Sequence, residues 1–403
     1  MGRFKFLNEL TERLRFYLNA LMYFLNLYSA LAVFKLFYRN RADKGLICMG
    51  SSNGKFCDEN VCELFRFLTA QGEKVFLVID RNSQDIHKIE GMGCLLYRFS
   101  FRANLMILRS EIMIYDTSYV DLIRCNSDFL KHIRKVNIFH GIHGLKKISI
   151  ENAANRVAND DYVIATSSHE VEIKKSWGFS KERIWLTGLP RFDVLSRKRD
   201  IQQQKKIFFM LTWRPWFKRD FLDPSYKDVE QFKNSDYFRE ILRVCSSKYL
   251  NELLLENGYV LEIYVHKLMH RYLKKLDISS ELSNIVFLDE KTNVQEQIIT
   301  SNILITDYSS VFFDFLYLNR PVILYQFDKE KYYRETPGSY IDETEISDLV
   351  VTDFESLLDK IRNTLDLKDN DSIQANNLLD KYVKYHDEEN CLRVYTNIKK
   401  LLV

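Results

Sequence analysis

Short apolar runs alternate with segments of helical spacing through most of this chain. The run GLICMGS (45–51) is followed by ENVCELFRFLTAQG (59–72), whose apolar residues recur at helical spacing, and then by KVFLVID (74–80). This order predicts a strand, a crossover helix and a second strand. Strands that are apolar along their whole length are typical of parallel sheets covered by helices on both faces. The pattern therefore predicts an α/β protein.

The same alternation continues in two series. In the first, five further predicted strands are CLLYRF (94–99), EIMIYD (111–116), KVNIF (135–139), YVIAT (162–166) and RIWLTG (183–188). In the second, the predicted strands are KIFFMLTW (206–213), VLEIYVH (260–266), NIVFLDE (284–290), NILITD (302–307) and PVILYQF (321–327), with helices such as YLNELLLENG (249–258) between them. Two successive series of this size predict two Rossmann-like domains that face each other across a cleft.

The length of the chain agrees with two domains. Its 403 residues exceed the ~250 to 300 residues at which a single core stops growing. The polar, unpatterned stretch SRKRDIQQQKK (196–206) is the best boundary. We therefore predict an N-terminal helix over 1–42, a first Rossmann-like domain over 43–200, and a second over 201–403 that includes the terminal helices.

Composition excludes several classes of partner. The net charge is +3 without a block of lysines and arginines, which argues against a nucleic-acid-binding protein. Seven cysteines at irregular spacing form no CxxC pair and no zinc-like cluster. Such a set is typical of reduced thiols in a cytosolic protein, and no metal site is predicted.

The N-terminal segment suggests a membrane. Residues 16–34 contain no charge, although Asn19, Asn26 and Ser29 interrupt them, and cations flank the stretch on both sides. A spanning helix needs about 20 predominantly apolar residues, which makes this stretch marginal. Aromatic residues and leucines with flanking cations predict instead a helix in the interface of an anionic bilayer. A helix packed on the protein's own domain and a single span are the alternatives.

Polar residues at the carboxyl ends of the strands decide the function, because ligands of open α/β sheets bind there. Four such stretches follow predicted strands: FHGIHGLKK (139–147), LTWRPW (211–216), YVHKLMH (264–270) and TDYSS (306–310). In the last, Ser309 and Ser310 precede a predicted helix, whose unpaired N–H groups and positive dipole end favour an anion such as phosphate. The alternative is that a serine merely caps the helix.

A histidine stands at a strand end in each predicted domain. His140 follows VNIF and precedes Gly141, and His266 follows LEIYV. A lone histidine at such a place is more often a hydrogen-bonded structural residue. Two histidines that face one cleft suit a transferase, with one as general base and the other binding or protonating a leaving phosphate.

These stretches, in this order, resemble the CDP-glycerol glycerophosphotransferases, the teichoic-acid primases and polymerases. Residues 306–335, TDYSSVFFDFLYLNRPVILYQFDKEKYYRE, resemble the family signature in which Thr-Asp-Tyr-Ser-Ser precedes an aspartate and a Lys/Arg-Pro strand. The loop at 139–147 is similar to the family's His-Gly-Thr-Pro-Leu-Lys, TGLPRFD (187–193) to Gly-Tyr-Pro-Arg-Asn-Asp, LTWRPW to Pro-Thr-Trp-Arg-Asp, and IYVHKLM (263–269) to a strand ending in Arg-x-His. The match runs from about residue 45 to 345.

The resemblance implies a GT-B architecture and an enzyme without a cofactor. Its substrate would be CDP-glycerol or CDP-ribitol, and its acceptor a lipid-linked saccharide or polymer at the cytoplasmic face of the bacterial membrane. By analogy, His140 is the general base, and His266, Ser309 and Ser310 hold the pyrophosphate. The other implied donor-site residues are Thr306, Asp307, Trp213 and Arg214.

The chain departs from the family pattern at four positions, which leaves the alditol open: Ile142, Gly144, Pro215 and Tyr264. His143 is an extra histidine that shares the role of base, contacts an acceptor phosphate or, as we expect, points to solvent. Lys146 either steers phosphate or is a surface charge. Arg191 and Asp193 lie at the predicted hinge, where they either contact a ligand or form a turn with a salt bridge.

Two other functions fit the same sequence. A GT-B glycosyltransferase would use a nucleotide sugar and release a nucleoside diphosphate instead of CMP. A non-catalytic scaffold at the membrane would keep the fold without needing the histidines.

Overall fold

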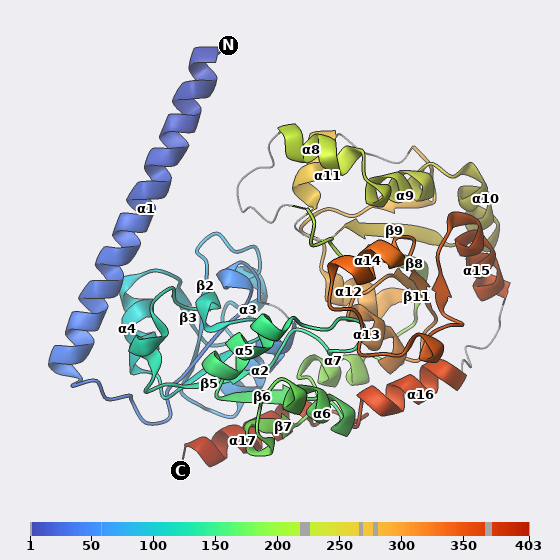
Figure 1. Cartoon of the computed structure of the whole chain (residues 1–403). Coiled ribbons are helices and arrows are strands. Elements are labelled where there is room, and N and C mark those ends of the chain that lie inside the picture. Colours follow the sequence, from blue (N-terminus) through green and yellow to red (C-terminus); the bar gives the residue numbers. More distant parts are fainter. Residues whose placement is uncertain are drawn as a thin grey trace.

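The computed structural model (Figure 1) describes residues 2–57, 59–217, 226–265, 269–276, 281–366 and 373–402. Two parallel β-sheets, each flanked by helices, follow one another along the chain and lie on either side of a cleft. The predicted GT-B-like arrangement of two Rossmann-like domains is confirmed.

The first sheet has seven parallel strands in the spatial order β3-β2-β1-β4-β5-β6-β7. They are β1 (Ile47–Gly50), β2 (Val75–Ile79), β3 (Cys94–Tyr97), β4 (Ile112–Tyr115), β5 (Arg134–Asn137), β6 (Tyr162–Ala165) and β7 (Ile184–Leu186). The helices of this half are α1 (Gly2–Phe37), α2 (Glu59–Ala70), α3 (Ile86–Ile89), α4 (Phe101–Arg109), α5 (Ile150–Asn159), α6 (Ser168–Ser176) and α7 (Arg191–Arg197). Every strand predicted in this half is present.

The second sheet has six parallel strands in the order β10-β9-β8-β11-β12-β13. They are β8 (Gln204–Leu211), β9 (Val260–Val265), β10 (Ile285–Phe287), β11 (Ser301–Thr306), β12 (Val322–Tyr325) and β13 (Val350–Val351). The helices that follow β8 are α8 (Tyr226–Lys233), α9 (Asp236–Cys245), α10 (Lys248–Asn257), α11 (His270–Leu276), α12 (Val294–Thr300), α13 (Val311–Tyr317), α14 (Lys329–Glu335), α15 (Phe354–Asp366), α16 (Ile373–Tyr382) and α17 (Asn390–Leu401). The five strands predicted here are present, and β13 adds a short edge.

The strand order places the cleft. Strands β1, β2 and β4 are buried along their whole length, which explains their unbroken apolar sequences. In each sheet the order reverses beside the first strand, between β1 and β4 and between β8 and β11. Parallel sheets bind ligands at such switch points. The loops after these strands line the cleft.

The end of the chain returns to the first half. Helix α16 packs against α13 and α6, and α17 packs against α2 and α7 (Figure 1). The Asp193 carboxylate fixes this return, because it accepts hydrogen bonds from the backbone N–H groups of Asn390 and Cys391 at 2.8 and 2.9 Å. Helix α17, which we had expected within the second domain at 201–403, therefore lies on the first half.

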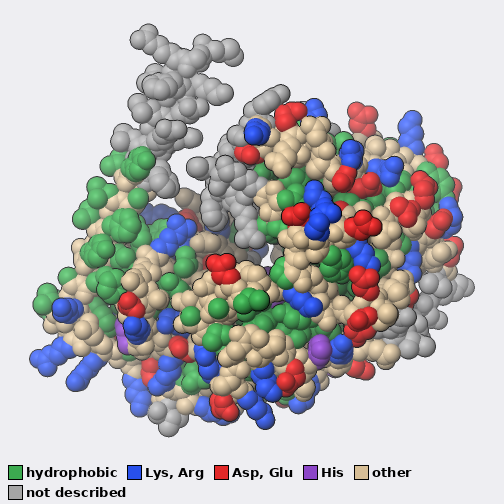
Figure 2. Space-filling view, viewed as in Figure 1, with side chains coloured by type: hydrophobic (Ala, Val, Ile, Leu, Met, Phe, Trp, Pro, Cys, Tyr) green, Lys and Arg blue, Asp and Glu red, His purple; other side chains and the backbone are tan. Residues whose placement is uncertain are grey.

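Helix α1 has one packed face and one open face. Its side chains are described from Tyr17 onward. Four of them are buried against the first half around α4: Tyr23, Leu27, Ala30 and Phe34. On the opposite face large apolar side chains are at least half exposed, among them Leu21 (55%) and Leu25 (53%), and Figure 2 shows this apolar surface along the helix. The segment Tyr17–Phe37 is long and apolar enough to cross a membrane by length and composition alone.

Candidate active site

A cleft of about 1110 Å³ separates the two halves and is lined by loops at the carboxyl ends of both sheets. The predicted site residues that line it are His140, His143, Lys146, Arg191, Trp213, Ser309 and Ser310. Position 266 lies outside the described residues, so the predicted role of His266 stays a prediction. Lys146 is half-buried in the cleft wall, and both of its predicted roles stay open.

The loop that carries His140 is held in an unusual backbone conformation. Phe139, the residue before it, has a φ of 47°, in the left-handed region that costs a non-glycine residue about 1 to 2 kcal/mol. The Phe139 N–H donates to Asn137 Oδ1 at 2.9 Å, and its carbonyl accepts from Asn60 Nδ2 at 2.8 Å. Arg191 Nη1 donates to the His140 carbonyl at 2.7 Å. These contacts fix where the imidazole enters the cleft.

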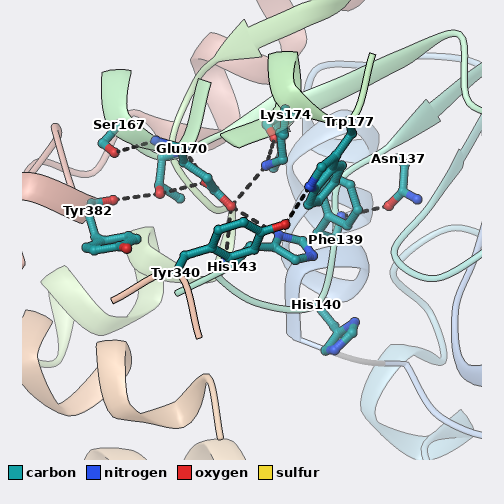
Figure 3. Close-up of polar contacts among 12 residues, drawn as sticks. Asn137, Phe139, His140, His143, Ser167, Glu170, Lys174, Trp177, Tyr340 and Tyr382 are labelled. Atoms are coloured by element: carbon teal, nitrogen blue, oxygen red, sulfur yellow. Dashed lines mark hydrogen bonds and ion pairs between the residues drawn. The ribbon is translucent and has the colours of Figure 1, made fainter. Parts of the chain in front are cut away.

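The His140 side chain is exposed to the water of the cleft, and the cleft walls enclose only part of it. This partial burial, followed by the nearby His143, Arg156 and Arg191, holds the pKa of His140 below its ordinary value. Because the ring touches cleft water, we expect a smaller fall than full burial would give. Figure 3 shows the ring apart from the hydrogen-bonded cluster around Glu170. His140 is therefore neutral at neutral pH, as a general base must be.

Ser309 and Ser310 face this loop from the second half. Both are half-buried in the cleft wall at the start of α13. Ser310 makes no side-chain hydrogen bond to the helix, and Ser309 Oγ accepts from Val311 N at a long 3.4 Å. A Cβ on Gly141 would lie 2.3 Å from Ser310 Oγ, so only glycine lets the His140 loop come this close. The hydroxyls are weak caps that lie beside the His140 loop.

Three predicted donor-site residues lie beneath the cleft and do not reach its surface. Arg214 and Asp307 are fully buried, with Arg214 Nη1 2.6 Å from Asp307 Oδ2, and Arg214 also binds Asp328 through Nε at 2.6 Å. Thr306 is buried and its Oγ1 donates to the Met210 carbonyl at 2.5 Å. The prediction that these side chains contact the donor is therefore wrong for this structure. They hold the loops after β8 and β11 in place, and Trp213 alone of that set lines the cleft.

The predicted hinge is a buried ion pair between the two halves. Arg191 begins α7, and its Nε and Nη2 bind both oxygens of Asp314 in α13 at 2.8 and 3.0 Å. Both side chains are almost fully buried. The pair joins the first half to the helix that follows the two serines. Asp193, by contrast, caps α17 and does not line the cleft among the described residues.

The expectation that His143 points to solvent is wrong. Its side chain is 15% exposed, and Nδ1 lies 3.2 Å from Glu170 Oε1 (Figure 3).

The departure from the family pattern at Gly144 has a structural reason. A Cβ there would lie 2.2 Å from Phe313 Cζ, so the proline of the family pattern does not fit at this position.

Aromatic side chains form much of the second half's cleft wall. The rings of Tyr308 and Tyr332 stack with centroids 3.5 Å apart, and Trp213, Tyr264 and Tyr272 line the same space. The four tyrosine rings are almost fully buried, so Trp213, which is half-buried, is the ring of this group that offers the cleft a face on which a nucleobase can stack. We predicted Trp213 but not Tyr272, Tyr308 or Tyr332, because a tyrosine in an α/β sequence is as readily explained by packing in the core.

The fold and the cleft define a GT-B-like protein of two Rossmann-like halves. The model of the CDP-glycerol:poly(glycerophosphate) glycerophosphotransferase family matches residues 32–400, and the chain belongs to that family.

Relatives agree with this assignment, and a solved structure shows the same fold. The chain is 26% identical over 364 residues to the minor teichoic acid biosynthesis protein GgaB of Bacillus subtilis (strain 168), covering 85% of this chain and 38% of that protein. It is 23% identical over 394 residues to the teichoic acid glycerol-phosphate transferase of Staphylococcus aureus (strain NCTC 8325 / PS 47), covering 89% and 94%. The wall teichoic acid polymerase TagF has the same fold, with a TM-score of 0.69 at 18% identity over 96% of this chain and 97% of that one.

Proposed function

We propose that this protein transfers an alditol phosphate from CDP-glycerol or CDP-ribitol to a hydroxyl of a lipid-linked or polymer acceptor and releases CMP. The observation that carries the proposal is the meeting, in a chain of this family, of the neutral His140 imidazole with the hydroxyls of Ser309 and Ser310 across one cleft. In the reaction the acceptor oxygen bonds to the β-phosphorus while the bond from that phosphorus to the CMP oxygen breaks. His140 takes the acceptor's proton.

The two halves would share this work. Ser309, Ser310 and the backbone at the start of α13 would stabilise charge on the pyrophosphate, and the half-buried ring of Trp213 would stack on the cytosine. Phosphoryl transfer needs mainly positioning and charge stabilisation, so no covalent intermediate is required. No group of three or more His, Cys, Asp or Glu suited to a metal occurs in the described part of the chain. That the reaction needs no cofactor stays a prediction.

Replacing both serines by alanine should weaken donor binding by about 1 to 3 kcal/mol, the order of one hydrogen bond to a charged phosphate, because the two hydroxyls serve the same pyrophosphate and their contributions are not additive. Calorimetric titration of CDP-glycerol and CDP-ribitol measures the effect. Ser235→Ala is the matched control, since Ser235 caps α9 at 3.2 Å from Phe238 N, away from the cleft. Unchanged donor affinity, with a loss of melting temperature like that of the control, would show that the serines only cap α13.

We place the site of action at the cytoplasmic face of the membrane, and the open apolar face of α1 supports a helix that lies in the lipid interface. Its packed face contacts α4, so a helix that lies on the bilayer can keep this contact while its open face contacts lipid. Leu21→Gln with Leu25→Gln should abolish flotation with anionic phosphatidylglycerol vesicles, whereas Leu255→Gln, at an exposed leucine (61%) in α10, should not. Wild-type protein that alkaline carbonate fails to release from membranes would instead indicate a span.

A further inference from the structure

His143 has its own hydrogen-bonded surroundings within the cleft wall. Its Nδ1 and its backbone N–H both lie 3.2 Å from Glu170 Oε1. The ring stands edge-on to Phe139 and Trp177, with centroids 4.7 and 4.8 Å away. Trp177 Nε1 in turn donates to Tyr340 Oη at 2.8 Å, so the second half closes the cluster (Figure 3). The ring has one orientation in this setting.

Glu170 is a carboxylate that can only accept. It is 1% exposed, and Lys174 Nζ lies 3.0 Å from Oε1. Thr166 donates to Oε2 from both its backbone N–H and its Oγ1 at 2.8 Å. Burial alone would raise the pKa of Glu170, but Lys174 and His143 outweigh it and hold that pKa well below its ordinary value. The buried charge is compensated and its oxygens are surrounded by donors.

This environment fixes the tautomer of His143. Because Glu170 Oε1 accepts, the ring proton sits on Nδ1, and Nε2 keeps its lone pair while the ring is neutral. Burial is the largest cause that lowers the pKa of His143, and the cations Lys174 and Arg156 lower it further. The Glu170 carboxylate raises this pKa, but less than the other causes lower it. His140 stands on the same loop. At neutral pH the ring is therefore an acceptor at Nε2.

The free side of the ring lies at the cleft. His143 lines it, and Nε2 has no hydrogen-bond partner among the described residues and is not sealed from solvent. A neutral imidazole nitrogen with a lone pair accepts from a hydroxyl and cannot donate to a phosphate oxygen. The first half of the cleft supplies further groups that suit hydroxyls, including Asn53, Asp80 and Asn82.

We propose that His143 binds a hydroxyl of the acceptor through Nε2, and that Glu170 is the positioning residue that fixes this ring. The inference rests on the proposed function, in which the acceptor is rich in hydroxyls. It gives the extra histidine a role distinct from that of His140: His140 takes the proton of the attacking hydroxyl, and His143 orients the acceptor that carries it.

The kinetic test separates acceptor from donor. With CDP-glycerol and short glycerol phosphate oligomers, His143→Ala should lower kcat/KM for the oligomer by about 10- to 100-fold, the loss of a hydrogen bond and of the orientation it gives. KM for CDP-glycerol should change less than about twofold, since the donor lies on the other half. Glu170→Gln should act in the same direction, because its amide no longer fixes the tautomer. His87→Ala, at an exposed histidine outside the cleft, is the control.

A second measurement needs no turnover. Nitrogen-15 NMR of the histidine rings should show His143, assigned by its loss in His143→Ala, as a neutral ring protonated on Nδ1 at pH 7, and as a mixture of tautomers in Glu170→Gln. An Nε2-protonated or doubly protonated ring would overturn the inference. So would an unchanged oligomer kcat/KM in His143→Ala beside an active wild type. A wild type inactive on every CDP-alditol would instead count against the proposed function. The NMR measurement would then still test the tautomer of His143 on which the inference depends.

Discussion

Replacing His140 by alanine is expected to lower turnover by ~10²- to 10⁴-fold, the usual contribution of a general base. In the proposed reaction the ring takes the proton of the acceptor hydroxyl and holds no part of the donor, so its loss should leave donor binding little changed. Steady-state CMP release and calorimetric CDP-glycerol binding, with His87→Ala as control, measure the two effects. A loss of turnover under threefold would reject the role of base.

The pH dependence follows from the same ring. A base works in its neutral form, so activity falls as the pH drops through its pKa. Because partial burial and neighbouring cations lower the pKa of His140, we expect the acid limb of the kcat/KM profile to lie below pH 6.5, the ordinary pKa of a histidine.

A cellular test addresses the scaffold alternative. An unchanged cellular phenotype for His140→Ala would favour the non-catalytic scaffold.

Replacing Arg191 by methionine is expected to lower the free energy of unfolding by about 3 to 5 kcal/mol. The change leaves Asp314 as an uncompensated buried charge, which costs roughly that much. It also removes the donor to the His140 carbonyl, so turnover should fall as well. Urea unfolding measures the stability. Arg197→Met on the same helix, with its side chain 45% exposed, should cost about 1 kcal/mol or less.

A second substitution isolates the ion pair. Adding Asp314→Leu to Arg191→Met should recover much of the stability, because a buried pair replaced by apolar groups is often neutral. The recovered stability should not restore turnover, since the His140 carbonyl still lacks its donor. A single Arg191→Met variant as stable as Arg197→Met would show that the pair does not hold the halves together.

The strands could be predicted because each one is a run of apolar residues between polar loops. Strand β13 was not predicted because its two valines are too short a run of apolar residues to indicate a strand. The return of α17 to the first half could not be predicted, since it depends on Asp193 capping a helix almost 200 residues away. Such a contact is a property of the folded chain and leaves no local pattern.

The sequence allowed us to predict which loops carry the site, but not which of their side chains face the cleft. Polar residues after strands correctly located His140, Trp213, Ser309 and Ser310 at the cleft. The same rule placed Arg214 there too, because sequence position does not reveal that Asp307 and Asp328 bury its guanidinium from two sides. Glu170 was missed because Ser-x-x-Glu is the pattern of a helix start. Its carboxylate instead turns toward a loop 27 residues earlier.

The measurement that tests the proposed function most directly is product release by the purified protein. CDP-glycerol, CDP-ribitol and common nucleotide sugars would each be supplied with a lipid-linked acceptor extract, and CMP and nucleoside diphosphates would be quantified. We predict CMP from a CDP-alditol and its loss in His140→Ala. No CMP from either CDP-alditol, with release of a nucleoside diphosphate from a nucleotide sugar, would contradict the phosphotransferase and identify a glycosyltransferase.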